Sequence, residues 1–115
     1  MAADSTTFVA AWLRAVDAFN NGDLAVLGEL LSDDCTFDGT AGRFGTTREE
    51  IVKALQDGRD AGWLSHNVIA TAAAGEFLVS VYENRYADGS RVTAAGCARF
   101  GADGKVTEIR SMDPR

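Results

Sequence analysis

The chain has 115 residues, of which 46% are hydrophobic, and a formal net charge of −6. This length and composition suit one domain, residues 1–115, that buries a core without disulfides or metals, and they are too apolar for a disordered chain. The acidic balance, with eleven scattered basic residues, argues against a nucleic-acid partner, which needs clustered Lys and Arg. No apolar run approaches the roughly 18 residues of a membrane span, so no membrane partner is expected.

Two helices are predicted first. Apolar residues recur at helical spacing over residues 6–21, and Gly22 is typical of the left-handed residue that ends a helix. Asp23 is placed to cap a second, shorter helix. A short strand is then predicted at residues 35–38, followed by a glycine-rich loop that ends at Gly45.

A third helix is predicted to begin at Thr47, which forms a capping box with Glu50. Beyond this helix the apolar pattern changes to a period of two. Four strand-like runs follow, at residues 63–74, 76–87, 90–101 and 105–113. The Asp-Gly pairs at residues 88–89 and 103–104 are typical of tight hairpin turns. Helices grouped before an antiparallel meander predict an α+β fold.

The alternation along these runs predicts a sheet with two unlike faces. Ala94, Gly96 and Ala98 share one face of the third run. Such small side chains leave room above the sheet, and this room is filled either by helix side chains or by a ligand.

Four motifs in order along the chain carry a family resemblance. Residues 20–24 join two helices, residues 30–37 lead into a strand, residues 45–51 start a helix and residues 98–108 form the last hairpin. Together they resemble the nuclear transport factor 2-like superfamily, on its SnoaL-like side. The resemblance implies a cone-shaped α+β barrel, with three N-terminal helices packed in a curved, mainly antiparallel sheet and a pocket open at one end. It also implies a homodimer through the outer face of the sheet.

Members of this superfamily include ketosteroid isomerase, limonene epoxide hydrolase, scytalone dehydratase, polyketide cyclases and non-enzymatic binding domains, so the resemblance implies no single activity. The three catalytic groups of ketosteroid isomerase, one Tyr and two Asp, would fall on Ala15, Gly39 and Gly96 of this chain. We therefore expect that the chain does not run that reaction by that arrangement.

Matching this chain to the family in the same way also predicts which of its residues face the pocket. The expected substrate-binding residues, from the helices and the concave face, are Trp12, Phe19, Val81, Ala94, Gly96, Ala98, Ile109 and Ser111. Trp63 is a further aromatic candidate for the lining. The outer face, and with it the centre of the homodimer interface, is predicted to carry Tyr82, Cys97, Arg99 and Arg110, because Tyr and Arg are enriched in interface cores.

Five residues are catalytic candidates, because the other predicted walls are apolar and cannot move protons: Asp113, Asp38, His66, Glu83 and Arg85. Asp113 is the first choice, since it lies on the predicted pocket face of the last strand. Glu83 and Arg85 form either a proton-transfer set with Asp113 or an ion pair at the rim. Asp38 is either a general base at the pocket mouth or the start of an Asx turn. His66 is either an acid–base group or a surface residue at a strand end.

No metal and no cofactor are expected. The chain has one histidine, and no Cys/His spacing resembles a zinc site. Cys35 and Cys97 form no CxxC pair, and residues 1–5 lack the basic and then apolar pattern of a targeting segment. We therefore expect two reduced thiols in a cytoplasmic protein.

The sequence leaves three functions open. The first is a cofactor-free acid–base enzyme, of the isomerase, cyclase, dehydratase or epoxide hydrolase type, acting on a small hydrophobic molecule. The second is a binding module that holds such a molecule unchanged, and the third is a dimerisation domain with a closed core. A cavity above roughly 300 Å³ with convergent polar groups favours the first two.

Overall fold

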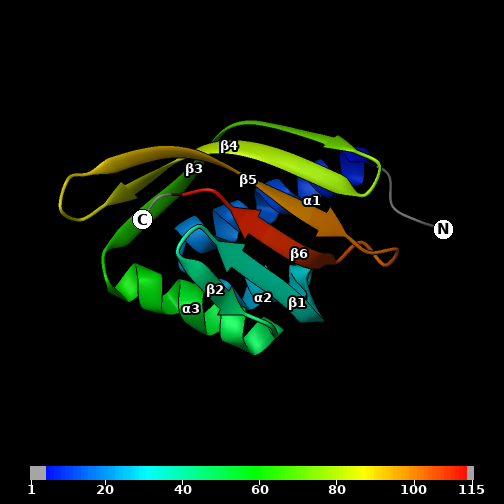
Figure 1. Ribbon diagram of the computed structural model, residues 1–115, viewed down its shortest axis with the longest axis horizontal. Helices are drawn as coiled ribbons and strands as arrows, with labels where there is room; N and C mark the ends of the chain where they lie inside the picture. The colour runs from blue at the N-terminus through cyan, green and yellow to red at the C-terminus, as the bar shows by residue number, and fades with distance from the viewer. Residues whose placement is uncertain (1–4, 114–115) are drawn as a thin grey trace.

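The computed structural model describes residues 5–113 and has three helices and a curved six-stranded sheet (Figure 1). The order along the chain is α1 Ser5–Asn20, α2 Leu24–Leu30, β1 Leu31–Gly39, β2 Gly42–Gly45, α3 Arg48–Asp60, β3 Trp63–Ala74, β4 Phe77–Tyr86, β5 Arg91–Phe100 and β6 Val106–Ser111. The predicted α+β class and the four long strands are confirmed. The predicted loop before α3 was wrong in part, because it contains β2, which pairs with β1.

The helix boundaries follow the local signals in the sequence. Gly22 has a φ of 79° and turns the chain sharply, and the Asp23 side chain then accepts a hydrogen bond from the backbone N–H of Val26 at 3.3 Å. Thr47 caps α3 in the same way, since its hydroxyl accepts from the backbone N–H of Glu50 at 3.2 Å. Both predicted caps are therefore confirmed.

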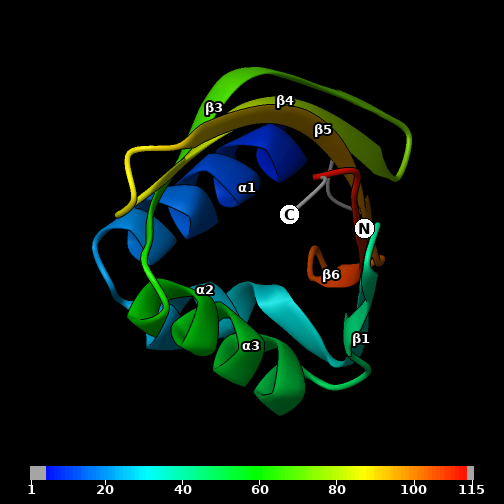
Figure 2. The same ribbon diagram turned by 60° about the vertical axis from the view of Figure 1, so that its left-hand side comes forward.

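The strands lie in the order β2-β1-β6-β5-β4-β3. The pairing of β1 with β6 is parallel, and the other four pairings are antiparallel. The sheet bends around the helices: Figure 2 shows β3, β4 and β5 arching over α1, with α2 and α3 on the far side of the enclosed space. The concave face of the sheet and the three helices therefore enclose the interior of the domain.

One end of this interior is filled by side chains. The rings of Phe8 from α1 and Phe100 from β5 stack with centroids 4.3 Å apart. Leu78, Ala98 and Val106 are buried beside them. Ala98 therefore belongs to the packed core, and the free space lies toward the opposite end of β4 and β5.

The hairpin between β4 and β5 decides which residues of β4 face inward. The backbone N–H of Tyr86 donates to the carbonyl of Ser90 at 3.1 Å, so the loop has three residues, 87–89, and Gly89 takes a φ of 88°. A two-residue turn at 88–89 would pair Val81 with Gly96. The observed loop pairs Ser80 with Gly96, and a one-residue change of register moves every side chain to the other face.

The predicted faces of β4 were therefore wrong. Val81, Glu83 and Arg85 lie on the outer face, whereas Leu78, Ser80, Tyr82 and Asn84 lie on the concave face and are buried. The loop before β6 also has three residues, 102–104. A one-residue shift of register between Arg99 and Phe100 reverses its effect on the side-chain directions of β6. Ile109 and Ser111 consequently face inward, opposite Ala98 and Gly96, as predicted.

Two bulges in β3 set the direction of its side chains. The first, between Val68 and Ala70, shifts the register by one residue, so that His66 lies directly opposite Asn84. Because directly opposed residues of an antiparallel pair share a face, His66 points inward with Asn84. The second bulge, between Trp63 and Ser65, brings Trp63 to the same side.

Both cysteines are free thiols, as predicted. Cys35 is fully buried, and burial, with smaller contributions from Asp34 and Glu108, raises the pKa of its thiol to about 12. It therefore packs as a small apolar side chain. None of the helices within residues 5–113 is long and apolar enough to cross a membrane.

Candidate functional site

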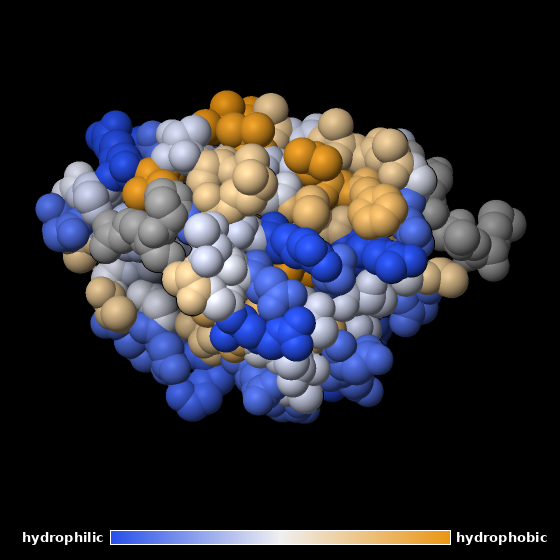
Figure 3. All heavy atoms as spheres, in the orientation of Figure 1, coloured by the Kyte–Doolittle hydropathy of each residue, from blue (hydrophilic) through white to orange (hydrophobic). Residues whose placement is uncertain are grey.

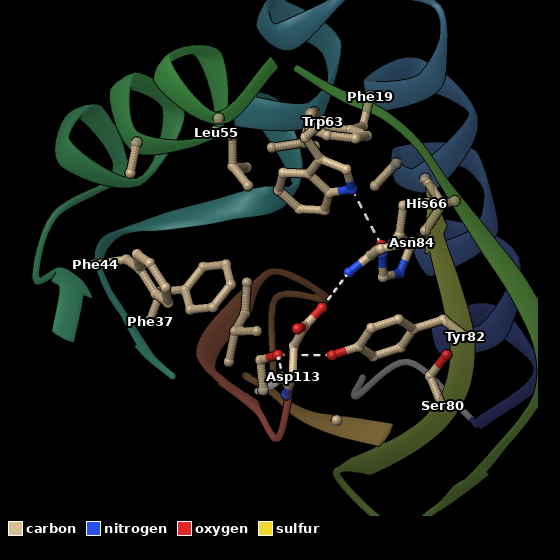
Figure 4. Close-up of a pocket in the computed structure, with 18 of the residues that line it drawn as sticks. Phe19, Phe37, Phe44, Leu55, Trp63, His66, Ser80, Tyr82, Asn84 and Asp113 are labelled. Carbon is tan, nitrogen blue, oxygen red and sulfur yellow. Dashed lines mark hydrogen bonds between the residues drawn. The ribbon is translucent and has the colours of Figure 1, made fainter. Parts of the chain in front are cut away.

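A cavity of about 380 Å³ lies between the concave face of the sheet and the three helices. Its walls are mainly apolar and aromatic, and Figure 4 shows the rings of Phe37 and Phe44 facing those of Trp63 and Tyr82 across it. The volume falls within the range of small-molecule sites, which are typically apolar with a few polar groups. The polar groups of this cavity are concentrated on one wall, formed by β3, β4 and the end of β6.

Three side chains form a hydrogen-bonded chain on this wall. His66 Nδ1 lies 2.7 Å from Asn84 Oδ1, and Asn84 Nδ2 donates to Asp113 Oδ2 at 2.5 Å (Figure 4). Asn84 is only 3% exposed. The amide therefore connects the imidazole to the carboxylate inside the domain, and all three residues line the cavity.

The imidazole is held firmly in place. Asn20, at the end of α1, brackets the backbone of His66: its amide donates to the His66 carbonyl and accepts from the His66 N–H, each at 2.8 Å. The ring itself packs against Tyr82, with centroids 4.3 Å apart. Burial lowers the pKa of His66 below its usual value of 6.5, although the Asn84 hydrogen bond and the Asp113 charge oppose this effect. The ring is therefore neutral near pH 7.

Tyr82 supplies a second polar group on the same wall. Its hydroxyl lies 2.6 Å from Ser111 Oγ, and Ser111 Oγ in turn accepts from the backbone N–H of Asp113 at 3.3 Å. Burial raises the pKa of the Tyr82 phenol above its usual value, so the phenol stays protonated and can donate a hydrogen bond.

Gly96 makes the Tyr82 position possible. A Cβ at residue 96 would lie 3.5 Å from Tyr82 Cε1 and only 2.8 Å from the backbone oxygen of Arg110. Without a side chain there, the Tyr82 ring reaches across β5 to Ser111 on β6. The space above the small residues of β5 is therefore taken in part by Tyr82.

Trp63 closes the wall toward α3. Its indole packs against Phe19 with centroids 4.4 Å apart, and its Nε1 donates to Asn84 Oδ1 at 3.1 Å. Gly58 allows this position, since a Cβ there would lie 3.0 Å from Trp63 Cε3. Two further lining residues, Trp12 and Ser80, have buried side-chain polar atoms with no partner among the described residues.

The structure brings several predicted site residues together. Of the catalytic candidates, His66 and Asp113 line the cavity. Of the predicted substrate-binding residues, those that line it are Trp12, Phe19, Gly96, Ile109 and Ser111. Ala94 and Ala98 share the concave face of β5 with Gly96 but do not line the cavity, and Val81 lies on the outer face.

The other three catalytic candidates lie elsewhere. Asp38 follows Phe37 in β1, so it points away from the cavity that Phe37 lines, and it pairs with Arg43 at 2.7 Å. The hydrogen bond from Arg43 lowers the pKa of Asp38. Glu83 pairs with Arg85 at 2.7 Å on the outer face, and this hydrogen bond lowers the pKa of Glu83. The predicted cavity-facing positions were wrong, whereas the ion pair between Glu83 and Arg85 is one of the two predicted alternatives. Ion-paired carboxylates outside the cavity are poor candidates for proton transfer to a ligand within it.

Two residues of the polar wall were not among the predicted site residues. Asn84 was passed over, and Tyr82 was expected on the outer face. Both follow from the three-residue hairpin loop at 87–89, because its register places all even-numbered residues from Leu78 to Asn84 beside Ala94, Gly96 and Ala98. A three-residue loop at 87–89, instead of a two-residue turn at 88–89, would have predicted that Tyr82 and Asn84 face inward.

Within residues 5–113 no group of three or more His, Cys, Asp or Glu side chains is arranged to hold a metal ion. Together, the curved sheet, the three helices on its concave face and the cavity between them are features of the nuclear transport factor 2-like class of small α+β domains.

The sequence assigns the family more closely. Residues 12–109 match the SnoaL-like domain, and the chain belongs to this family. No curated protein sequence matches the chain. Three solved structures illustrate the likeness in fold. An NTF2-like protein of unknown function from Cytophaga hutchinsonii is 18% identical with a TM-score of 0.80, and the match covers 98% of this chain and 94% of that one.

The other two structures carry functional names. A protein provisionally named an isomerase of the SnoaL-like family, from Agrobacterium tumefaciens, is 11% identical with a TM-score of 0.77, over 96% of this chain and 99% of that one. A protein provisionally named a polyketide cyclase, from Sinorhizobium meliloti, is 16% identical with a TM-score of 0.79, over 91% and 93% of the two chains. At these identities the likeness shows the fold alone.

Proposed function

We propose that the protein is a cofactor-free acid–base enzyme, of the isomerase or cyclase type, acting on a small hydrophobic molecule held in the cavity. The observation that carries this proposal is the chain His66–Asn84–Asp113 on one wall of an otherwise apolar cavity. Burying polar side chains among apolar ones costs desolvation free energy, which an apolar core of the same shape would avoid. Titratable groups with shifted pKa values, such as His66, are also concentrated at functional sites.

The two titratable ends of this chain suit different steps. A neutral imidazole takes a proton near pH 7, and a carboxylate two hydrogen bonds away stabilises the imidazolium that forms. The protonated Tyr82 phenol, which packs on His66, donates a hydrogen bond to the oxygen where negative charge develops. Isomerisation and cyclisation need no other groups, because the proton removed at one atom returns at another.

Non-catalytic ligand binding is the second candidate function. It is supported by the aromatic walls formed by Trp12, Phe37, Phe44 and Trp63, which hold a planar apolar molecule whether or not it reacts. The two candidates differ in what Asp113 does: a catalytic Asp113 acts on rate, whereas a binding residue acts on affinity.

The test uses the tryptophans. The chain has two tryptophans, and Trp12 and Trp63 both line the cavity, so ligand entry should quench their fluorescence. A panel of apolar carbonyl compounds and phenols is titrated, and each ligand is then incubated with the protein and examined by mass spectrometry and NMR for an isomeric product. Turnover that is lost in Asp113→Asn supports the enzyme. Binding without turnover replaces it with the binding module.

We further propose that the protein forms a homodimer through the outer face of the sheet. Tyr82 is removed from the predicted interface, because it is buried in the cavity wall. The exposed apolar residues of this face are Phe77, Val79 and Val81 on β4, and the same face carries Arg99 and Arg110. The ion pairs Glu76–Arg99 and Glu108–Arg110 flank it. A face with both signs of charge at its rim is self-complementary in a two-fold dimer.

A further inference from the structure

We infer that Asn84 is a positioning residue that holds His66 in the Nδ1–H tautomer, so that Nε2 is the base and the cavity takes an uncharged ligand with a weakly acidic O–H or C–H. The ligand part rests on the proposed function, whereas the tautomer part rests on the hydrogen bonds of the free protein.

The first step fixes the orientation of the Asn84 amide. An indole N–H only donates, so the atom of Asn84 that lies 3.1 Å from Trp63 Nε1 must be the oxygen. The nitrogen then faces Asp113 Oδ2, which accepts from it. A flipped amide would place two donors together at Trp63 and two acceptors together at Asp113, and both contacts would be repulsive.

The second step fixes the proton on His66. Asn84 Oδ1 carries no hydrogen, so the 2.7 Å contact with His66 Nδ1 requires that Nδ1 carries it. In a neutral imidazole the other nitrogen, Nε2, then has the free lone pair. No hydrogen bond to Nε2 is formed by the described residues. Because Nδ1 is held by Asn84, Nε2 is the nitrogen that can act as a base.

The third step concerns ligand charge. The charged residues that line the cavity are Asp113 and Arg110. Arg110 is exposed, and its guanidinium pairs with Glu108 at 3.4 Å, so it offers no free cation to a ligand. An anionic ligand would bring a second negative charge toward Asp113 in a low-dielectric space, which costs binding free energy. A neutral ligand avoids this cost.

The proton transfer balances within the site. The ligand O–H or C–H bond breaks, its proton bonds to Nε2, and the electron pair stays on the ligand as a phenolate or enolate. His66 is then an imidazolium that still donates from Nδ1 to Asn84 Oδ1. The proton returns from Nε2 to another ligand atom, so no oxidant, reductant or second substrate is required.

The experiment exploits the single histidine of the chain. Two-dimensional ¹H–¹⁵N long-range spectra of ¹⁵N-labelled protein at neutral pH show which imidazole nitrogen is protonated. We expect one neutral form with the proton on Nδ1. In Asn84→Leu, which removes the acceptor but fills the space, we expect a mixture of tautomers. Glu83→Gln, one residue away on the outer face, is the matched control and should keep the wild-type spectrum. A wild-type spectrum with the proton on Nε2 overturns the inference whether or not Asn84→Leu folds.

The ligand class is tested with a shape-matched pair. The His66 ring signals are followed while 2-naphthol or 2-naphthoate is added at pH 7. We expect naphthol to bind at least about tenfold more tightly, because the difference is one negative charge beside Asp113. Equal or tighter binding of naphthoate, or no binding of naphthol, overturns the ligand part. Failure of the proposed function is distinct: the tautomer is as inferred and naphthol binds, but no member of the carbonyl and phenol panel is converted.

Discussion

Each of the two faces of β4 carries side chains that are unusual for its side of a sheet. On the concave face, Ser80 and Asn84 are each 3% exposed although both are polar. On the outer face, Phe77 and Val79 are 47% and 54% exposed although both are apolar. Figure 3 shows apolar side chains gathered on the surface above β3, β4 and β5. Two polar residues thus lie inside and two apolar residues lie outside on the same strand, although Leu78 inside and the Glu83–Arg85 ion pair outside follow the usual pattern.

These exposures are the basis for proposing that the inner face of β4 binds a ligand and that its outer face binds a second copy of the chain. Asn84 lies in a satisfied hydrogen-bond network, whereas the buried Ser80 hydroxyl has no partner among the described residues; an unsatisfied buried group of this kind needs an explanation, and a ligand in the cavity supplies one. Exposed contiguous apolar side chains mark a surface that another surface covers. The inner face is therefore the candidate site, and the outer face is the candidate interface. Four changes test this division, from the largest expected effect to the smallest.

The largest effect is expected from Asp113→Asn on the inner face. This change keeps the shape and the hydrogen bond from Asn84 but removes the carboxylate charge. If the inner face is catalytic, the turnover rate falls roughly 10²-fold or more, the usual scale of acid–base catalysis, with little change in ligand affinity. Steady-state kinetics with a converted ligand measure both quantities. Glu83→Gln on the outer face is the control, and an equal loss of rate in that variant would break the comparison between the faces.

The next effect is expected from Val81→Arg on the outer face. Two-fold symmetry would bring the new charge into the interface from both protomers, where like charges repel. We expect the dissociation constant of the dimer to rise about 100-fold or more, with the cavity unaffected. Sedimentation velocity at micromolar concentrations measures this change, and Lys53→Ala on exposed α3 is the control. A wild-type protein that sediments as a monomer contradicts the dimer outright.

The sequence predicted the elements of this fold better than the faces of its strands. The helix caps at Asp23 and Thr47 and the turns at Gly75, Gly89 and Gly104 are local signals, and each is present at its predicted place. The face of β4 depends instead on whether the loop after it has two or three residues, and an Asp-Gly pair is compatible with both. This single ambiguity placed Glu83 and Arg85 inside and Asn84 outside.

The candidate site was predictable where the irregularities of a strand pair cancel, and not where they do not. Asp113 and Ser111 were placed correctly because the bulge at Thr107 in β6 compensates for the loop between β5 and β6. His66 was identified by residue type, but its inward direction depends on the bulge between Val68 and Ala70, which has no glycine or proline to mark it. Long-range hydrogen bonds, such as that between His66 and Asn84, follow from such irregularities and are not encoded in local spacing.

A smaller effect is expected from Gly96→Ala, which tests how the inner face accommodates Tyr82. The new Cβ would lie 2.8 Å from the Arg110 carbonyl oxygen, so the backbone of β6 must shift and the Tyr82–Ser111 contact weakens. We expect a loss of about 1–3 kcal/mol in the free energy of unfolding, as for other overpacked sites. Urea denaturation measures it. Ala95→Gly on the outer face is the control, with an expected loss of about 0.5–1 kcal/mol; a larger loss there than at Gly96 would contradict the packing described for Tyr82.

The smallest effect is expected in the pH dependence of stability. Because burial lowers the pKa of His66 in the folded state below 6.5, the unfolded chain binds its proton at a higher pH than the folded chain does. The free energy of unfolding should therefore fall as the pH drops below about 6.5, and less so in His66→Gln. His66→Gln removes the imidazole and keeps every other ionisable side chain, so the difference between the two profiles reports the contribution of His66 together with its interactions. Identical pH profiles for the two proteins would show that His66 is not buried in its neutral form.

The most direct test of the central claim is a crystal structure of the protein purified from its native host, inspected for a bound molecule in the cavity. We predict density for a planar apolar ligand between Phe37, Phe44 and Trp63, with one polar atom within hydrogen-bond distance of His66 Nε2. A cavity that holds only water, or a ligand whose polar atoms all point away from His66 and Asp113, would contradict the assignment of this wall as the functional site.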